Sequence, residues 1–202
     1  MPNPSAKTYL QELANLHLRE FKGDFLPSLG IEFLTQLYYD LFTNNRSVFI
    51  VETNKHKIVG YVIGVYHASN LISSIIRRRF LRYSLLLIPA MIKKPDLFLN
   101  ILETFRYSKK SDFSTSDVEL LVIAVIKQHR RHNIGSKLLR SLEKRFIQHN
   151  VRDYRVSVNA SNKIAQSFYQ KHNFKKKREF TMYQKKWHLY TKTLLLGHNS
   201  SC

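Results

Sequence analysis

Hydrophobic and polar residues alternate along the chain with two different periods, and these periods predict its elements. In the first forty residues apolar side chains recur every three or four positions, which predicts helices with breaks at 22–24 and 29–30. Two short runs rich in Val, Ile and Tyr follow at 47–52 and 58–67, joined by five polar residues. This arrangement is typical of a β-hairpin.

The second half alternates between strands and helices. Residues 118–126 form a nearly continuous apolar run, typical of a central strand covered on both faces. The order then predicted is helix, strand, helix, strand, strand, at 134–147, 154–158, 162–172, 174–183 and 187–195. Strands joined through helices should lie parallel, and hairpins at both ends add antiparallel partners. We therefore expect an α/β fold with a central mixed β-sheet flanked by helices, in a single domain over residues 1–202.

The segment at 70–110 is the exception to this pattern. It combines arginine clusters with leucine runs, and we expect two or three helices there, broken near Pro89 and Pro95, before a polar loop at 111–116. Because the segment is too long for a plain connector, we interpret it as an inserted helical lid over an acceptor site. The same mixture of residues also suits contact with an anionic membrane surface.

Charge and composition narrow the classes of protein. Residues 118–202 hold 18 Lys and Arg against 4 Asp and Glu, within a chain of 202 residues and net charge +19. Such a field attracts nucleic acid, acidic lipids or a phosphorylated small molecule. The only cysteine is Cys202, and the nine histidines show no paired spacing, so we expect no disulfide within the chain and no metal. The first residues lack the order of a signal peptide, which favours a cytoplasmic protein, with the inner face of a membrane as an alternative place.

The junction between Val125 and Gly135 has the most informative chemistry. A buried strand ends there, seven mostly polar residues follow, and a long helix begins. A helix N-terminus offers free N–H groups and the positive end of a dipole, and Arg130 and Arg131 add donors suited to phosphate. Gly135 lets a ligand approach the backbone, and Asn133 suits a turn that needs positive φ. The stretch therefore predicts a pyrophosphate cradle.

Two motifs in this half resemble those of the GCN5-related N-acetyltransferases, which move an acyl group from acyl-coenzyme A to an amine. The cofactor motif Q/R-x-x-G-x-G/A is similar to residues 130–135, with Asn133 in place of the first glycine and Arg131 at another position that is often glycine. The motif Asn-x-x-Ala-x-x-Phe-Tyr-x-x-x-x-Phe is similar to residues 162–174, with Asn173 in place of its usual glycine. The resemblance covers about 118–174 and implies an acyl-CoA N-acyltransferase fold.

The resemblance also implies a place for acetyl-CoA. Backbone groups of Ile123 and Val125 would pair with the pantetheine arm like an added strand. The pyrophosphate would be held by backbone N–H groups of the loop and the helix start, with Arg130 as a side-chain contact. Asn162 would bond the pantetheine or orient the thioester region. The residues placed at the pyrophosphate are Arg130, Arg131, His132, Asn133, Ile134, Gly135 and Ser136.

Two residues are expected to take part in the reaction. Tyr169 would protonate the leaving thiolate, since a phenol of pKa about 10 matches a thiol of similar basicity. Glu119 stands where the family often has a base, and it would act through an ordered water. Direct transfer in a ternary complex is expected, with the thioester carbonyl polarised by a strand N–H. The plainer interpretations are core packing for Tyr169, a helix cap for Asn162 and an ion pair for Glu119.

Several partners fit this interpretation. The acceptor would be the primary amine of a small molecule or amino sugar, with a protein amine as an alternative, and a homodimer is also compatible with the sequence. Competing hypotheses are a basic protein that binds nucleic acid, which lacks a recognisable reading motif, and a non-catalytic relative that keeps coenzyme A. Peripheral membrane contact stays open, and no specific nucleic-acid partner is expected.

Overall fold

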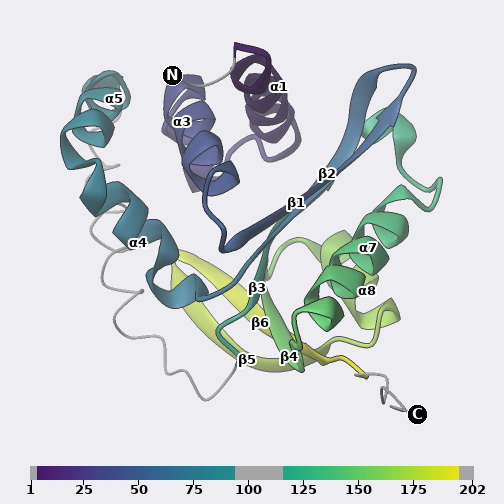
Figure 1. The fold of residues 1–202 in the computed structure, drawn as a ribbon. Helices are drawn as coiled ribbons and strands as arrows, with labels where there is room; N and C mark the ends of the chain where they lie inside the picture. The colour runs from purple at the N-terminus through teal and green to yellow at the C-terminus, as the bar shows by residue number, and fades with distance from the viewer. Residues whose placement is uncertain (1–3, 94–115, 196–202) are drawn as a thin grey trace.

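The computed structural model describes residues 4–93 and 116–195 (Figure 1). The helical N-terminal part and the first hairpin are followed by two further helices and then by the alternating half. The elements are α1 (Pro4–Glu20), α2 (Phe25–Ser28), α3 (Ile31–Phe42), β1 (Ser47–Asn54), β2 (Lys57–Val65), α4 (Ala68–Arg78), α5 (Phe80–Lys93), β3 (Glu119–Val125), the 3-10 turn η1 (Lys127–His129), α7 (Ile134–Gln148), β4 (Asp153–Asn159), α8 (Lys163–Lys171), β5 (Lys175–Met182) and β6 (Lys185–Thr193).

The strands form one six-stranded sheet in the order β1-β2-β3-β4-β6-β5. The pair β3–β4, which is connected through α7, is parallel, and the other neighbouring pairs are antiparallel. One apolar cluster joins α1, α3, α4 and α5 to one face of β2, and a second joins α7 and α8 to the opposite face. The mixed α/β fold expected from the sequence is therefore confirmed, with β6 inserted between β4 and β5.

Helix α7 lies unusually close to strand β2 because two glycines of that strand leave room for it. A Cβ on Gly64 would come within 2.6 Å of Leu142 and Phe146, and one on Gly60 would come within 2.9 Å of the Ala124 carbonyl oxygen. Close packing of this kind tolerates no added methyl group without a shift. The two glycines thus fix the distance between α7 and the sheet, and with it the position of the α7 N-terminus.

Three details of the predicted elements are wrong. The first hairpin turns through Lys55 and His56 alone, and the second turns through Tyr183 and Gln184, so both loops are shorter than expected. All four residues have positive φ, as a tight two-residue turn requires, yet none is the Gly or Asn that usually marks one. The helix break expected at Pro89 falls instead at Arg79, because Pro89 is accommodated inside α5 on its exposed side.

The helical insertion is described only in part. Its described residues form α4 and α5, and α5 packs against α3 on the side away from α1 (Figure 1). Pro95, the rest of the segment to 110 and residues 111–115 of the expected loop lie outside the described residues. The lid over an acceptor site therefore stays a prediction.

Candidate active site

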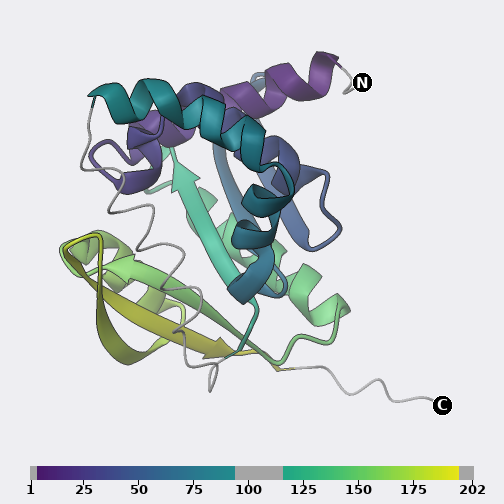
Figure 2. The same cartoon turned by 90° about the vertical axis from the view of Figure 1, so that its left-hand side faces the viewer.

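Strands β3 and β4 form a wedge that opens toward their carboxyl ends. They share a single register pair, Glu119 with Arg155, next to a hydrogen bond from Arg155 N–H to the Val118 carbonyl at 2.9 Å. Beyond that point the two strands diverge, as the view onto the left-hand side of the molecule shows (Figure 2). By contrast, β4 pairs with β6 over its whole length. One edge of β3 therefore lacks a strand neighbour among the described residues.

The backbone of Ile123 and Val125 faces this open edge. The N–H of Ile126 donates to Val59 on the opposite side at 3.0 Å, and backbone groups alternate along a strand. A β-bulge interrupts the pairing of β3 with β2, because Ile63 pairs with Val122 and Gly64 with Leu120, which leaves Leu121 as the extra residue. Bulges are common beside active sites, where they redirect backbone groups.

The loop after β3 has the conformation of an anion cradle. Arg131 and Asn133 adopt the left-handed region, with φ of 64° and 62°, as expected for Asn133 from the sequence. Helix α7 starts without a side-chain cap, and no backbone N–H from 131 to 136 donates to an acceptor within the described residues. Six consecutive N–H groups beside a helix N-terminus attract an anion.

Arg130 holds this loop to the rest of the molecule. Its Nε donates to the Val125 carbonyl at 3.0 Å, and its Nη2 donates to Glu20 at 2.6 Å. Glu20 is the last residue of α1, and its side chain is buried. His132 Nδ1 lies 2.9 Å from the Arg130 carbonyl. The guanidinium is thus already engaged in the protein, and its contact with a phosphate stays a prediction.

Helix α8 lies beside the start of α7. A Cβ on Gly135 would touch Phe168 at 3.4 Å, and the Ser136 hydroxyl lies 2.9 Å from His172 Nε2. Asn162 caps α8, because its Oδ1 accepts a hydrogen bond from the Ala165 N–H at 3.0 Å. The cap is the plainer of its two expected roles, and a contact with the cofactor stays a prediction.

Tyr169 is buried among aromatic rings. Its centroid lies 5.0 Å from that of Phe174 and 6.5 Å from that of Tyr190. Burial raises the pKa of Tyr169, so the phenol stays protonated near neutral pH. Its hydroxyl forms no hydrogen bond with the described part of the chain. A protonated and uncommitted hydroxyl is what a proton donor needs, whereas the raised pKa makes this phenol a weaker acid than the free phenol assumed from the sequence. The acid role of Tyr169 therefore stays a prediction.

Glu119 lies at the closed end of the wedge. Its Oε2 accepts from Arg155 Nε at 3.0 Å, and its Oε1 accepts from the Ser157 hydroxyl at 3.4 Å. Both charged side chains are largely buried. The ion pair that the sequence offered as the plainer interpretation is therefore present, and the role as a base stays a prediction.

Near the open end of the wedge, the loop between α1 and α2 meets the β5–β6 turn. Phe25 stacks on Tyr183 with centroids 4.3 Å apart, and Lys185 donates to the Gly23 carbonyl at 3.1 Å. Beside them a hollow of about 400 Å³ is lined by Lys22, Gly23, Asp24, Asn159, Ala160, Ser161, Lys185 and Lys186. Because Asn159 ends β4, this hollow offers an entry for a second substrate.

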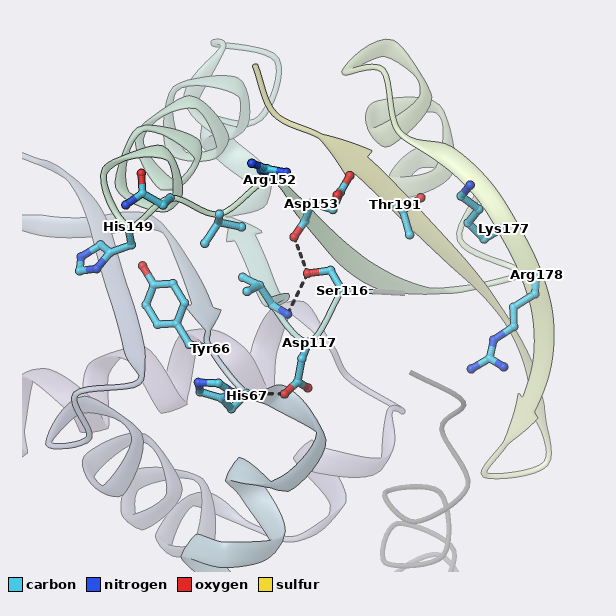
Figure 3. Close-up of a pocket in the computed structure, with 13 residues that line it drawn as sticks. Tyr66, His67, Ser116, Asp117, His149, Arg152, Asp153, Lys177, Arg178 and Thr191 are labelled. Atoms are coloured by element: carbon cyan, nitrogen blue, oxygen red, sulfur yellow. Dashed lines mark hydrogen bonds and ion pairs between the residues drawn. The ribbon is translucent and has the colours of Figure 1, made fainter. Parts of the chain in front are cut away.

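A larger hollow of about 870 Å³ lies at the other end of the sheet (Figure 3). It is lined by the starts of β3 and β4, where Ser116 bonds the Asp153 carbonyl and His67 pairs with Asp117 at 3.4 Å. Ligands of open α/β sheets bind outside the carboxyl ends of the strands. We therefore place the candidate site at the wedge and the α7 N-terminus rather than in this hollow.

Sequence reasoning missed three features near the site. The Leu121 bulge has no signature in an unbroken apolar run. Glu20 is one of several charged residues on an amphipathic helix, and nothing in the sequence points from it to Arg130, 110 residues away. His17, Tyr38 and Tyr61 form a buried hydrogen-bonded trio, in which the Tyr38 hydroxyl lies 2.6 Å from His17 Nδ1 and 2.9 Å from the Tyr61 hydroxyl. Only their helical or strand periodicity was visible.

Comparison with known proteins agrees with this geometry. A family model described as the acetyltransferase (GNAT) family matches residues 10–174. No curated protein matches the sequence. Similar solved structures include a PaiA N-acetyltransferase from Thermoplasma acidophilum in complex with coenzyme A, at 15% identity over 93% of this chain and 94% of that chain, with a TM-score of 0.59.

Two others are NAA60 from Arabidopsis thaliana in complex with a bisubstrate analogue and the ribosomal-protein-S18-alanine N-acetyltransferase from Escherichia coli. The first is 15% identical over 95% of this chain and 94% of that chain, with a TM-score of 0.57. The second is 14% identical over 82% of this chain and 80% of that chain, with a TM-score of 0.51. At such identities the likeness shows the fold alone.

Proposed function

The chain belongs to the GNAT family of acetyltransferases, and from this premise we propose that it transfers an acetyl group from acetyl-CoA to a primary amine by direct transfer in a ternary complex. The observation that supports this best is the wedge. Within the described residues, a strand edge without a neighbour leads through the short η1 turn to a row of N–H groups without acceptors. An extended, hydrogen-bonding arm joined to a diphosphate fits such a surface.

The residues present fit acetyl-CoA, whose thioester supplies the activated acetyl group. The backbone of Ile123 and Val125 would pair with the pantetheine. The Val125 carbonyl already accepts a hydrogen bond from Arg130 Nε, so it would serve as acceptor for both. The N–H groups from Arg131 to Ser136 would hold the pyrophosphate. Gly135 leaves the helix start open, because a side chain there would press against Phe168. Asn162 would remain a cap and present its amide N–H₂ to the arm.

Tyr169 would supply a proton to the thiolate that leaves. Its hydroxyl is protonated and is not committed to another described residue, and its raised pKa makes it a weaker acid than a free phenol. The N–H of Ile123, which faces the open edge close to the Leu121 bulge, would polarise the thioester carbonyl. Glu119 would take the proton of the amine through a water, provided that its bond to Arg155 leaves it accessible.

The acceptor would enter beside the hollow near the β5–β6 turn. We propose a small-molecule amine or an amino sugar, because the segment at Asp24 and Phe25 contacts the β5–β6 turn beside this hollow and so narrows the entrance. The contact consists of the Phe25–Tyr183 stack and the ion pair between Lys185 Nζ and Asp24 Oδ1 at 3.6 Å. A peptide N-terminus or a protein lysine is the second candidate, and protein acceptors occur in the names of similar folds.

The first test is calorimetric titration with acetyl-CoA and with coenzyme A. We expect the native protein to bind both, and Gly135→Trp to weaken binding at least tenfold by filling the helix start. Ile164→Trp is the matched control, because Ile164 is 80% exposed on α8 and its replacement should leave affinity unchanged. Equal affinity of the native protein and Gly135→Trp would contradict the proposed cradle.

The second test is a panel of amines scored by the release of free thiol. Tyr169→Phe should lower kcat by roughly 10²-fold or more, as loss of a general acid does, with little change in acetyl-CoA affinity. An unchanged kcat in Tyr169→Phe would refute the acid role, and thiol release that does not depend on the amine would contradict transfer to an amine. Binding of coenzyme A without transfer to any amine would favour a non-catalytic relative.

A further inference from the structure

Helix α5 presents a stripe of large apolar side chains to solvent. Leu81, Leu85, Ile88 and Ile92 are 78, 67, 48 and 78% exposed, and Phe80 beside them is 64% exposed. Their spacing of four, three and four residues places the four aliphatic side chains on one face of the helix. Five exposed large apolar residues on one helix exceed what a soluble surface normally carries by chance.

The stripe is not the result of a loosely attached helix. On the opposite face Tyr83 is buried, its ring lies 5.2 Å from that of Phe33, and its hydroxyl donates to Asp40 on α3 at 2.8 Å. Arg79, at the junction of α4 and α5, pairs with the same carboxylate at 3.4 Å. The helix is therefore anchored by one face while its other apolar face is left without a cover among the described residues.

The same segment carries a concentrated positive charge. Between residues 68 and 93 there are four arginines, one lysine and no aspartate or glutamate. Arg77, Arg78 and Arg82 are exposed. Arg82 follows Leu81 and precedes Leu85 by three residues, so its Cα lies beside the apolar stripe. In Figure 2, α4 and α5 lie in front of α3 on the side that faces the viewer, so nothing in the described fold stands between this surface and an external partner.

We propose that this face of α4 and α5, which we call the α5 surface, docks on a bilayer that contains anionic lipid. The apolar stripe would enter the boundary between headgroups and acyl chains, and Arg77, Arg78 and Arg82 would contact the headgroups. Helix α5 has 14 residues, and at 1.5 Å per residue it is about 21 Å long, too short to span the hydrocarbon core. No described helix is long and apolar enough to cross a membrane. The helix would thus lie in the plane of the interface.

A second copy of this chain is the alternative occupant of the α5 surface, and charge repulsion disfavours it. A two-fold contact brings the same patch of both molecules together, so it would gather the exposed arginines of both copies in one interface to which the 68–93 segment contributes no acidic residue. Each molecule also carries a net charge of +19. An anionic bilayer supplies an apolar phase for the stripe and the opposite charge for the arginines. A nucleic acid supplies only the charge. The proposal is independent of acyl transfer.

The test is sedimentation with sucrose-loaded vesicles. One set contains phosphatidylcholine alone, and the other contains phosphatidylcholine with about 30% of the anionic lipid phosphatidylglycerol. The native protein should bind the mixed vesicles at least tenfold more tightly than the neutral ones. Replacing Leu81, Leu85 and Ile92 by Gln should reduce binding at least tenfold without changing charge, and Ile164→Gln should not.

A second set of variants separates local charge from total charge. Replacement of Arg77, Arg78 and Arg82 by Gln should weaken binding about 100-fold at low salt, since each cation near such a surface contributes about a factor of five. Replacement of the exposed Lys55, Lys57 and Lys144 by Gln changes the net charge equally and should have a much smaller effect. Circular dichroism of each variant checks that the fold is kept.

Three results would overturn the proposal. The first is equal binding to neutral and mixed vesicles. The second is equal loss of binding in the two charge variants. The third is a dimer of the native protein by light scattering that the Gln variant of Leu81, Leu85 and Ile92 abolishes, because this would assign the stripe to a second copy of the chain.

Discussion

Asn133 allows a sharp test of the link between backbone conformation and cofactor binding. It sits at φ 62° and ψ 6° just before α7, where the family motif has glycine, and its side chain makes no capping bond. Replacement by valine therefore removes no side-chain hydrogen bond of the helix start. It does force a β-branched residue into the left-handed region, which such residues rarely adopt.

The structure supplies the magnitude and the matched control. The left-handed region costs an ordinary residue about 1–2 kcal/mol, and valine should lie at the upper end, about 2 kcal/mol. For a chain of this size each kcal/mol lowers Tm by roughly 2–4 °C, so Asn133→Val should lose about 4–8 °C. Asn150 follows α7 with φ 57°, and Asn150→Val should lose a similar amount far from the loop.

The assays are thermal unfolding and calorimetric titration with acetyl-CoA. Asn133→Val should bind at least tenfold more weakly, because a shifted loop turns its N–H groups away from the pyrophosphate, whereas Asn150→Val should bind as the native protein does. Asn133→Gly should bind acetyl-CoA with the affinity of the native protein, because glycine adopts positive φ freely. If Asn133→Val loses stability and yet binds normally, the loop conformation does not determine cofactor binding and the cradle is wrongly placed.

Two further predictions concern stability. Gly64→Ala should lower the free energy of unfolding by about 1–3 kcal/mol through overpacking, because the new Cβ would stand 2.6 Å from Leu142 and Phe146. Gly135→Ala, whose Cβ would lie 3.4 Å from Phe168, should lower it far less. Urea unfolding measures both, and equal losses would contradict the close packing of α7. Burial lowers the pKa of His17 to about 4, so between pH 6.5 and about 4 the unfolded state binds the extra proton. Stability should therefore be complete above pH 6.5 and fall by up to about 3 kcal/mol as the pH drops through this window, with a smaller slope in His17→Gln; parallel slopes would show that another group is responsible.

The parts of the fold that the sequence predicts are those set by local periodicity. Helix α7 and strand β4 differ from their predicted bounds by at most one residue at each end, because an amphipathic stripe defines the helix and the alternating Tyr154, Val156 and Val158 define the strand. Asn133, Asn150 and Asn173 all have positive φ, and at 133 and 173 the glycine of the family motif marks such a position. The turn at Lys55–His56 was not foreseen, because neither residue type signals positive φ.

The parts that could not be predicted depend on contacts between distant residues. Arg130 suggested a phosphate ligand because arginines on loops beside helix starts bind anions, but its partners are Glu20 and the Val125 carbonyl. The wedge between β3 and β4 likewise depends on where the two strands stop pairing, which no property of either strand alone specifies. Local patterns thus find the loop, while tertiary contacts decide what its side chains do.

Glu119 shows how this difference affects the mechanism. Its two oxygens are bonded to Arg155 and Ser157 at the only register pair of β3 and β4, so the same carboxylate closes the wedge and is the candidate base. If closing the wedge is its main role, Glu119→Gln and Arg155→Gln should both destabilise the fold, by about 3 kcal/mol as for a broken buried pair, and both should weaken acetyl-CoA binding. If it is the base, only Glu119→Gln should lower kcat, while acetyl-CoA affinity is kept. The Arg155→Gln variant separates the two roles, because it removes the ion pair and leaves the carboxylate in place; full loss of turnover in that variant, with acetyl-CoA still bound, would exclude a base that acts independently of the wedge.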